Sequence, residues 1–267
     1  NIHMITGLGT AFLKDNILQK FSIFLYKYSL DKKNIIFFQN KDDLNFFIDK
    51  KIIKTIEYQL LPGSGIDLIK YFYSEYNENK ELTFLFVGRL LKSKGINEYL
   101  IAAEKISNFY PKIKFQIAGE MVNDKKDKMN VNLFNKLILN NKIDYIGHQK
   151  NIIPHIINSD CVVLPSYREG TPRSLLESLS LGRPIITSNA VGCKEVIINN
   201  KNGYICNKEN ALSLEKSILK FINLDYSERV KMSIFGRKFV EENFDENFVI
   251  QKYLHTIKTI LLFKNET

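Results

Sequence analysis

The feature that most constrains the fold is an alternation, from Leu82 onward, of short apolar runs with segments of helical periodicity. The apolar runs are rich in β-branched and aromatic residues, which is typical of strands buried on both faces. Regular alternation of strands with helices predicts a parallel, doubly wound α/β sheet. We expect strands at 82–87, 113–118, 143–146, 161–165 and 184–187, and helices at 95–109, 131–139, 152–157, 172–181 and over most of the chain after 211.

The first 78 residues show the same alternation over a shorter length, and we interpret them as a partial second α/β layer. A glycine-rich loop at 62–65 indicates a domain junction, and a polar stretch at 74–81 indicates a linker. Because the chain opens on a strand-like run at Asn1 and not on Met, we expect it to be part of a longer protein. In this part we expect strands at 2–6, 35–38 and 58–61 and helices at 16–30 and 42–48, with Asn40 as the cap of the second helix. We expect the chain to divide into three parts, at 1–78, 79–245 and 246–267, of which the last is a single helix.

Composition excludes several classes of protein. With 267 residues, 45% of them hydrophobic and 25% charged, the chain is neither disordered nor fibrous and is long enough for one to two domains. Lys and Arg number 38 against 29 Asp and Glu, and the net charge of +9 suits an anionic partner such as phosphate, nucleic acid or an acidic membrane surface. Charge alone does not choose among these three.

Cysteine usage indicates a reducing compartment, and hydropathy indicates no membrane-spanning segment. Cys161, Cys193 and Cys206 are too few and too far apart for a disulfide framework or a CxxC metal site, and we expect them to be small core residues. No stretch reaches the ~18 uncharged apolar residues of a membrane-spanning helix, and no signal peptide is recognisable. We therefore expect a cytoplasmic location.

The most informative stretch runs from Cys161 to Ser188. A buried strand leads through a short loop to a helix, for which we expect Thr171 as the N-cap and Pro172 as the first residue. In a parallel sheet this loop lies at the carboxyl edge, where free N–H groups and the helix dipole favour an anion. Glu169 and Glu177 flank the turn, and a carboxylate can accept hydrogen bonds from two neighbouring sugar hydroxyls.

A second strand also ends in a glycine that is followed by cations. Gly88 closes the expected strand at 82–87, and Arg89 and Lys94 lie on the loop before the next helix. Arg offers a planar fork and Lys a point charge, and together they suit a diphosphate. No acidic cluster here is typical of a Mg²⁺ site, because Asp124 and Asp127 lie in a Lys-rich loop. We therefore expect side chains, without a metal ion, to neutralise the diphosphate.

The order of these motifs resembles the retaining glycosyltransferases of family 4. GRLLKSKG begins at Gly88, IAGE at Ile117, EGTPRSLLE at Glu169 and NGY at Asn202. The family has the two-domain GT-B fold and an E-x7-E motif, so the resemblance implies two Rossmann-like domains, of which the N-terminal, acceptor-side one is only partly present. The EGTPRSLLE form is similar to the subgroup that acts on undecaprenyl-diphosphate-linked saccharides in capsule, O-antigen or N-glycan assembly.

The resemblance also implies roles for individual residues. Arg89 and Lys94, beside Gly88, would hold the nucleotide diphosphate and stabilise the leaving group. Glu169 would face the donor sugar, so Arg89, Lys94 and Glu169 would be the catalytic residues. The remaining contacts to the nucleotide would come from Glu177 at the ribose hydroxyls, the amides of Gly170, Thr171 and Arg173 near the phosphates, and the segment around His148 at the base.

The implied activity is transfer of an N-acetylhexosamine or hexose from a UDP-sugar to a lipid-diphosphate-linked saccharide, with retention of configuration and without a cofactor or metal. The implied location is the inner face of the cytoplasmic membrane, as a peripheral protein on an anionic surface. One alternative is an inactive nucleotide-sugar-binding fragment. Another is a nucleic-acid binder, which is disfavoured because no motif interleaves aromatic and basic residues.

Each functional interpretation has a structural alternative. Glu169 and Glu177 could be solvated acids at a helix start, and Arg89 and Lys94 could be surface cations. Arg173 could contact Glu169, an acceptor phosphate or only solvent, and His148 is more simply a structural or exposed residue.

Two features near the N-terminus leave further questions. Many family members carry a histidine where this chain has Gly7, which questions any mechanism that needs an imidazole. The apolar residues of the helix expected at 16–30 could lie on a bilayer, but core packing is the simpler expectation for Phe21, Phe24, Tyr26 and Tyr28.

Overall fold

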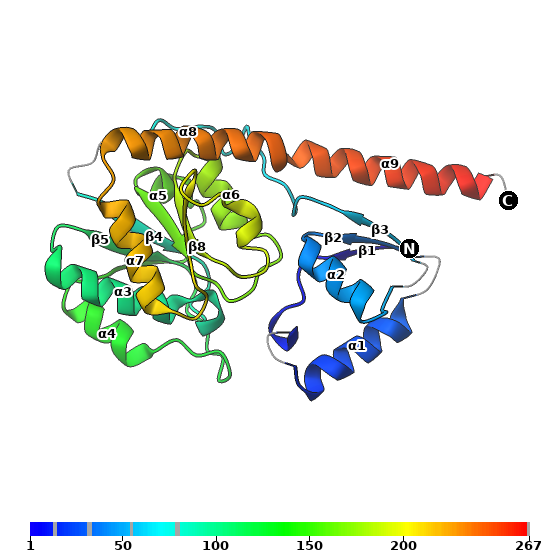
Figure 1. The fold of residues 1–267 in the computed structure, drawn as a ribbon, viewed down its shortest axis with the longest axis horizontal. Helices are drawn as coiled ribbons and strands as arrows, with labels where there is room; N and C mark the ends of the chain where they lie inside the picture. The colour runs from blue at the N-terminus through cyan, green and yellow to red at the C-terminus, as the bar shows by residue number, and fades with distance from the viewer. Residues whose placement is uncertain (13–14, 31–33, 54–55, 78–80, 266–267) are drawn as a thin grey trace.

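The computed structural model describes residues 1–12, 15–30, 34–53, 56–77 and 81–265, and it contains two separate parallel sheets (Figure 1). The larger sheet has six strands in the order β6-β5-β4-β7-β8-β9, and every neighbouring pair is parallel. The predicted doubly wound sheet is therefore confirmed. Its strands are β4 (Thr83–Val87), β5 (Lys114–Ala118), β6 (Asp144–Gly147), β7 (Cys161–Leu164), β8 (Ile185–Ser188) and β9 (Gly203–Cys206).

Helices cover both faces of this sheet. The helix α3 packs against α4 and α7, whereas α6 packs against α8. Because both faces are covered, Phe84, Leu85 and Phe86 of β4 are completely buried. The helices of this six-stranded half are α3 (Ile96–Phe109), α4 (Val131–Leu139), α5 (Ile153–Ile157), α6 (Arg173–Ser180), α7 (Ala211–Ile222) and α8 (Tyr226–Asn243).

The order of the strands determines where a ligand can bind. After β4 the chain adds β5 and β6 on one side, and it then returns to place β7 on the other side of β4. The loops that leave the carboxyl ends of β4 and β7 therefore diverge, and such a switch point forms a crevice in open α/β sheets. Both predicted motif loops start at this point.

The second sheet has three parallel strands in the order β1-β2-β3. In β2, Ile36 and Phe38 face the helix layer that contains Phe47 of α2, while Phe37 faces the opposite side of the sheet. Both faces of β2 are thus covered, as the unbroken apolar sequence predicts. This three-stranded half consists of β1 (Ile2–Ile5), β2 (Ile35–Phe38), β3 (Glu57–Leu60), the short η1 turn (Thr10–Phe12), α1 (Ile17–Ser29) and α2 (Lys41–Asp49).

The last helix, α9 (Glu246–Asn265), runs from the end of α8 across to the three-stranded half (Figure 1). The ring of Tyr253 lies 4.6 Å from that of Phe37, measured between centroids. Gln59 donates a hydrogen bond to Thr256 at 3.2 Å, and Lys252 donates one to the carbonyl of Leu60 at 2.9 Å. The helix thus covers the face of the sheet opposite α1 and α2. These contacts show which elements pack together but do not show where one domain ends and the next begins, so the domain limits at 78 and 245 stay predictions.

The linker between the halves is tied to the six-stranded half by a buried arginine. Arg183 is 2% exposed, and its guanidinium donates to the carbonyls of Ser74, Glu75 and Ile157 at 2.9 to 3.2 Å. The predicted linker is therefore held over part of its length by side-chain to backbone hydrogen bonds. Residues 78–80 of the predicted linker lie outside the described residues.

Several local expectations are confirmed. Asn40 caps α2, since its Oδ1 accepts a hydrogen bond from the Asp43 amide at 2.8 Å. The three cysteines are buried, and burial raises the pKa of the Cys161 thiol and raises that of Cys193 to about 12. Within the described part of the chain, no helix combines the length and the apolar character needed to cross a membrane.

Two local expectations are wrong. Thr171 does not cap α6: the helix begins at Arg173, Pro172 occupies the cap position without a side-chain bond, and the Thr171 hydroxyl donates instead to the carbonyl of Gln39 at 3.3 Å. Core packing of α1 also fails for most of its aromatic residues. Tyr26 packs against other rings, but Phe21, Phe24 and Tyr28 are 57%, 62% and 85% exposed, because the helix turns only one stripe toward the sheet.

Candidate functional site

The loop after β4 positions two cations at the centre of the sheet edge. The Gly88 amide donates to the carbonyl of Ala118 at 3.0 Å, which extends the β4–β5 pairing to the edge. The chain then forms the η2 turn (Lys92–Lys94) and enters α3 through Gly95, which has a φ of +75°. A Cβ at this glycine would lie 2.2 Å from the carbonyl oxygen of Pro165, so a side chain does not fit there. The close approach places Lys94 directly beside the β7 loop.

The loop after β7 brings a carboxylate to the same place. Its start is tied to the β4 loop, since the Ser166 hydroxyl and the Tyr167 amide donate to the carbonyl of Ser93 at 3.0 and 2.8 Å. Farther along, the Lys94 ammonium lies 2.5 Å from Glu169 Oε1, and the two side chains are 22% and 13% exposed. The structure therefore brings two of the predicted catalytic residues into contact across the switch point.

A cavity of about 310 Å³ opens at this ion pair. Its lining contains three cations and one carboxylate, so the local field favours an anionic ligand. The Arg89 side chain is exposed and makes no hydrogen bond or ion pair with another described residue. The cavity is lined by Thr6, Gly7, Gly9, Arg89, Ser93, Lys94, Arg168, Glu169 and Gly170, and thus by both halves of the chain.

The two halves meet most closely at a pair of glycines. A Cβ on Gly170 would lie 1.5 Å from the carbonyl oxygen of Thr6, and a Cβ on Gly7 would lie 3.0 Å from the Gly170 amide nitrogen. Gly7 has a φ of +143°, which L side chains rarely adopt. Backbone contact at this point explains why a glycine suits position 7. No side chain from position 7 reaches the cavity.

A second cavity of about 420 Å³ lies beside the first, on the β5–β6 side of the switch point. Arg89 lines both cavities, so a ligand that fills both would pass this guanidinium. The predicted base-side residue His148 is exposed and lies on the wall of the second cavity. The cavity is lined by Val87, Gly88, Arg89, Ala118, Gly119, Glu120, His148, Gln149 and Ile152.

The helix α6 carries the predicted site residues Arg173 and Glu177, and Thr171 lies just before it; none of the three lines either cavity. Glu177 is 9% exposed, and its Oε1 accepts hydrogen bonds from the Tyr71 hydroxyl at 2.8 Å and from Arg173 Nε at 3.1 Å. Burial, and then the bond to Glu177, raise the pKa of Tyr71 to about 12. Neither Glu177 nor Arg173 lines either cavity. Arg173 thus pairs with Glu177 and not with Glu169.

The sequence analysis missed a contact on the N-terminal side of Glu169. Arg168 lines the smaller cavity, and its guanidinium forms an ion pair with Asp43 of α2. Burial raises the pKa of Asp43, while the hydrogen bond from Asn40 and the charge of Arg168 act in the opposite direction. The position of Arg168 directly before the motif glutamate was the available signal. The identity of its partner was not readable, because the two residues are 125 positions apart.

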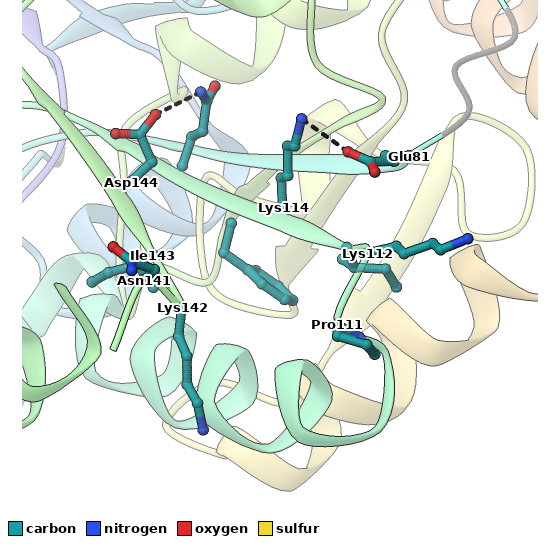
Figure 2. A pocket seen from close by; sticks show the side chains of 11 residues that line it. Glu81, Pro111, Lys112, Lys114, Asn141, Lys142, Ile143 and Asp144 are labelled. Atoms are coloured by element: carbon teal, nitrogen blue, oxygen red, sulfur yellow. Dashed lines mark hydrogen bonds and ion pairs between the residues drawn. The ribbon is translucent and has the colours of Figure 1, made fainter. Parts of the chain in front are cut away.

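A separate hollow of about 480 Å³ lies at the amino ends of β5 and β6, which is the sheet edge opposite the switch point (Figure 2). Three of its five charged side chains, those of Glu81, Lys114 and Asp144, have partners within the hollow. Lys114 pairs with Glu81 at 3.0 Å, and Gln116 donates to Asp144 at 2.9 Å. We therefore place the functional site at the carboxyl edge. Among the described residues, no group of three or more His, Cys, Asp or Glu could hold a metal ion, and metal independence stays a prediction.

Comparison with known proteins identifies related sequences. A protein of Campylobacter jejuni, N,N'-diacetylbacillosaminyl-diphospho-undecaprenol alpha-1,3-N-acetylgalactosaminyltransferase, is 25% identical over 268 residues, which cover 94% of this chain and 68% of the relative. An Escherichia coli UDP-Gal:alpha-D-GlcNAc-diphosphoundecaprenol alpha-1,3-galactosyltransferase is 32% identical over 184 residues, 62% of this chain and 45% of the relative. The chain thus spans from about half to about two thirds of the length of such relatives.

Solved structures share the fold at lower sequence identity. Anabaena HepE in complex with UDP has a TM-score of 0.79 at 15% identity, with 97% of this chain and 72% of that chain covered. Sucrose-phosphate synthase from Thermosynechococcus elongatus has a TM-score of 0.79 at 17% identity, with coverage of 98% and 68%. A family model, Glycosyl transferases group 1, matches residues 71–239. Because this match covers more than half of the chain, the protein belongs to the group 1 glycosyl transferases and has the GT-B fold of that family.

Proposed function

We propose that this chain is the donor-binding part of a glycosyltransferase that moves a sugar from a UDP-sugar to a lipid-diphosphate-linked saccharide with retention of configuration. The observation that carries the proposal is the cavity at the switch point, where Arg89 is unpaired among described residues and Lys94 contacts Glu169 at 2.5 Å. The names of two relatives support the substrate classes, since both describe transfer to a diphosphoundecaprenol-linked sugar.

The donor would span both cavities. The base would enter the larger cavity beside His148, the diphosphate would lie against Arg89, which lines both, and the sugar would occupy the smaller cavity at Glu169. The ribose would lie between the base and the diphosphate. Glu177 lines neither cavity, so its predicted contact with the ribose hydroxyls requires the donor to extend beyond both cavities toward α6. Hydrogen bonds from described residues to the Glu177 carboxylate go to Oε1, so Oε2 is the acceptor that we assign to that contact.

Donor binding would exchange partners within the Lys94–Glu169 pair. The ammonium of Lys94 would turn from the carboxylate to a diphosphate oxygen, and Glu169 would then accept hydrogen bonds from sugar hydroxyls. The Lys94–Glu169 ion pair is replaced by an ion pair between Lys94 and the diphosphate and by hydrogen bonds from sugar hydroxyls to Glu169, so neither side chain is left without a hydrogen-bond partner. This replacement makes occupation of the cavity favourable when the ligand is both anionic and a sugar.

In the transfer step the bond between the anomeric carbon and the β-phosphate oxygen breaks, and a bond from that carbon to an acceptor oxygen forms. The departing oxygen keeps the electron pair, and the acceptor proton passes to it. Arg89 and Lys94 stabilise the negative charge that develops on the diphosphate, in a site that is partly shielded from water. Side chains supply this charge in the proposal, without a metal ion.

The acceptor would approach from the three-stranded half, at the inner face of the cytoplasmic membrane. Thr6, Gly7 and Gly9 of this half form one wall of the smaller cavity. The net charge of +9 suits both the diphosphate groups of the substrates and an anionic lipid surface.

Calorimetric titration of UDP tests the diphosphate assignment. We expect the Arg89→Ala, Lys94→Ala double variant to bind UDP at least about 100-fold more weakly than the wild type, because it loses two charge-assisted hydrogen-bond donors. Lys105→Ala is the matched control, since Lys105 is exposed and pairs with Glu215 away from the cavities. Equal affinity of the double variant and the wild type would contradict the assignment. Product analysis with a lipid-linked saccharide then distinguishes a transferase from a module that only binds the nucleotide sugar.

A further inference from the structure

The loop that carries Glu169 is held from the other half of the molecule. Arg168 extends from this loop to the first turn of α2, where its guanidinium pairs with Asp43 Oδ1. The Arg168 side chain is 16% exposed and that of Asp43 is completely buried. A buried carboxylate without a cation would be costly, so this pair links the two halves firmly.

Asp43 is itself fixed by the cap of its helix. Asn40 Oδ1 accepts from the Asp43 amide at 2.8 Å, and Asn40 Nδ2 donates to Asp43 Oδ2 at 3.0 Å. Both carboxylate oxygens therefore have partners. Asn40 Nδ2 also donates to the carbonyl of Gly170 at 3.3 Å. The first turn of α2 thus holds the residues on both sides of Glu169.

The ion pair with Asp43 prevents the Arg168 guanidinium from pairing with Glu169. Arg168 lines the smaller cavity together with Glu169, and its Nε is buried without a partner among the described residues. Glu169 is the one carboxylate among the described residues that line that cavity, so it would be available to the guanidinium if Asp43 did not hold it. Arg168 would then compete with the sugar hydroxyls for Glu169.

We propose that Asp43 and Arg168 are positioning residues for recognition of the donor sugar: the pair keeps the Arg168 guanidinium away from Glu169 and fixes the backbone on either side of that carboxylate. This inference rests on the proposed function, because it takes Glu169 as the residue that faces the sugar. Its consequence is that the three-stranded half contributes to selection of the sugar without contacting the nucleotide. The effect is therefore specific to the sugar part of the donor.

Binding measurements with UDP and with UDP-sugars separate the contribution of the sugar from that of the nucleotide. UDP, UDP-glucose, UDP-galactose and UDP-N-acetylglucosamine are titrated calorimetrically into the wild type, and the UDP-sugar that binds best is compared with UDP in each variant. We expect Asp43→Asn to weaken binding of the UDP-sugar about tenfold, the effect of one charge-assisted hydrogen bond, and to change UDP affinity less than about twofold. Asp42→Asn is the matched control on the same turn, since Asp42 pairs at 2.8 Å with the half-exposed Lys194, and we expect it to change neither affinity.

A second variant tests the competition for Glu169. In Asp43→Asn, Arg168→Gln both charges are removed and no guanidinium remains near Glu169, so we expect the thermal stability to return toward the wild-type value. We expect the UDP-sugar affinity to recover in part, because the competition is gone but the backbone beside Glu169 is still not fixed. A double variant that regains thermal stability but binds the UDP-sugar as weakly as Asp43→Asn would overturn the proposal, and so would equal weakening of UDP and UDP-sugar in Asp43→Asn. Failure of the wild type to bind UDP at all would instead contradict the proposed function.

Discussion

The two halves of the molecule use the same strand and helix pattern but differ in how completely it is buried. In the six-stranded half, helices cover both faces of the central strand β4, and Phe84 and Phe86 are completely buried. In the three-stranded half, β2 is covered as well, but α1 exposes Ile17, Phe24 and Tyr28 to 86%, 62% and 85%. The six-stranded half therefore closes its core with several helices on both faces, whereas the three-stranded half depends on the single helix α9 to close one face of its sheet.

This difference has a consequence for the site. The cations Arg89 and Lys94 lie on loops of the closed core, while Asp43, Gly7 and Thr6 come from the half that is less completely buried. Replacing one Phe at a time by Ala in the two cores and on α1 measures the difference directly.

The largest effect is expected for Phe84→Ala in the six-stranded half. Phe84 is completely buried between the rings of Phe115, at 5.6 Å, and Phe221, at 5.7 Å. Removing the ring leaves a cavity among packed neighbours, so we expect the free energy of unfolding to fall by about 4 kcal/mol in urea titrations. A loss below about 1 kcal/mol would show that this core rearranges freely and that the halves do not differ in packing.

A smaller loss is expected for Phe37→Ala in the three-stranded half. Phe37 is also completely buried, but it belongs to a small cluster with Leu61 and Val249 that α9 closes with Tyr253. A single helix can move into the space, so we expect a loss of about 3 kcal/mol. UDP affinity, which the proposed function assigns to the six-stranded half, should change less than about twofold by calorimetry. Loss of UDP binding would show that the halves do not respond separately.

The smallest effect is expected for Phe24→Ala on the exposed stripe of α1. Because the ring is 62% exposed, we expect the free energy of unfolding to change by less than about 0.5 kcal/mol. Tyr26→Ala is the control from the same helix, since Tyr26 packs against Phe12 and Phe47, and it should cost more. A loss for Phe24→Ala as large as that for Phe37→Ala would mean that this stripe is covered in solution, for example by a second copy or by further polypeptide.

Most elements could be predicted because their signals are local. The helix at Val131–Leu139 and the strand at Ile35–Phe38 have the predicted limits, since each has a strong period and a clear boundary residue. The strand β9 (Gly203–Cys206) was not predicted, because four residues beginning with glycine carry too weak a pattern. The break between α7 and α8 was also not predicted, although Asp225 and Glu228 form a capping box there.

The cations and the first glutamate of the candidate site were predictable from the sequence, but the residues that contact and hold the site loops were not. Gly88, Arg89, Lys94 and Glu169 follow the two strands that lie side by side at the switch point, and the structure brings them together. Glu177 has the predicted spacing, yet the structure pairs it with Tyr71, 106 positions away and just before the predicted linker. Thr171 was assigned to the helix cap from local preference, but its hydroxyl bonds to Gln39 of the other half.

The sequence by itself determined the strands, the helices, the loops at the carboxyl edge and the chemistry that those loops carry. These properties arise from residue type and from periods of two and 3.6 residues, which act over one element at a time. The tertiary structure decided that Glu169 pairs with Lys94 and Arg168 with Asp43. Those pairings depend on strand order and on the approach of two sheets, and residues 75 and 125 positions apart become neighbours only through the packing of the whole chain.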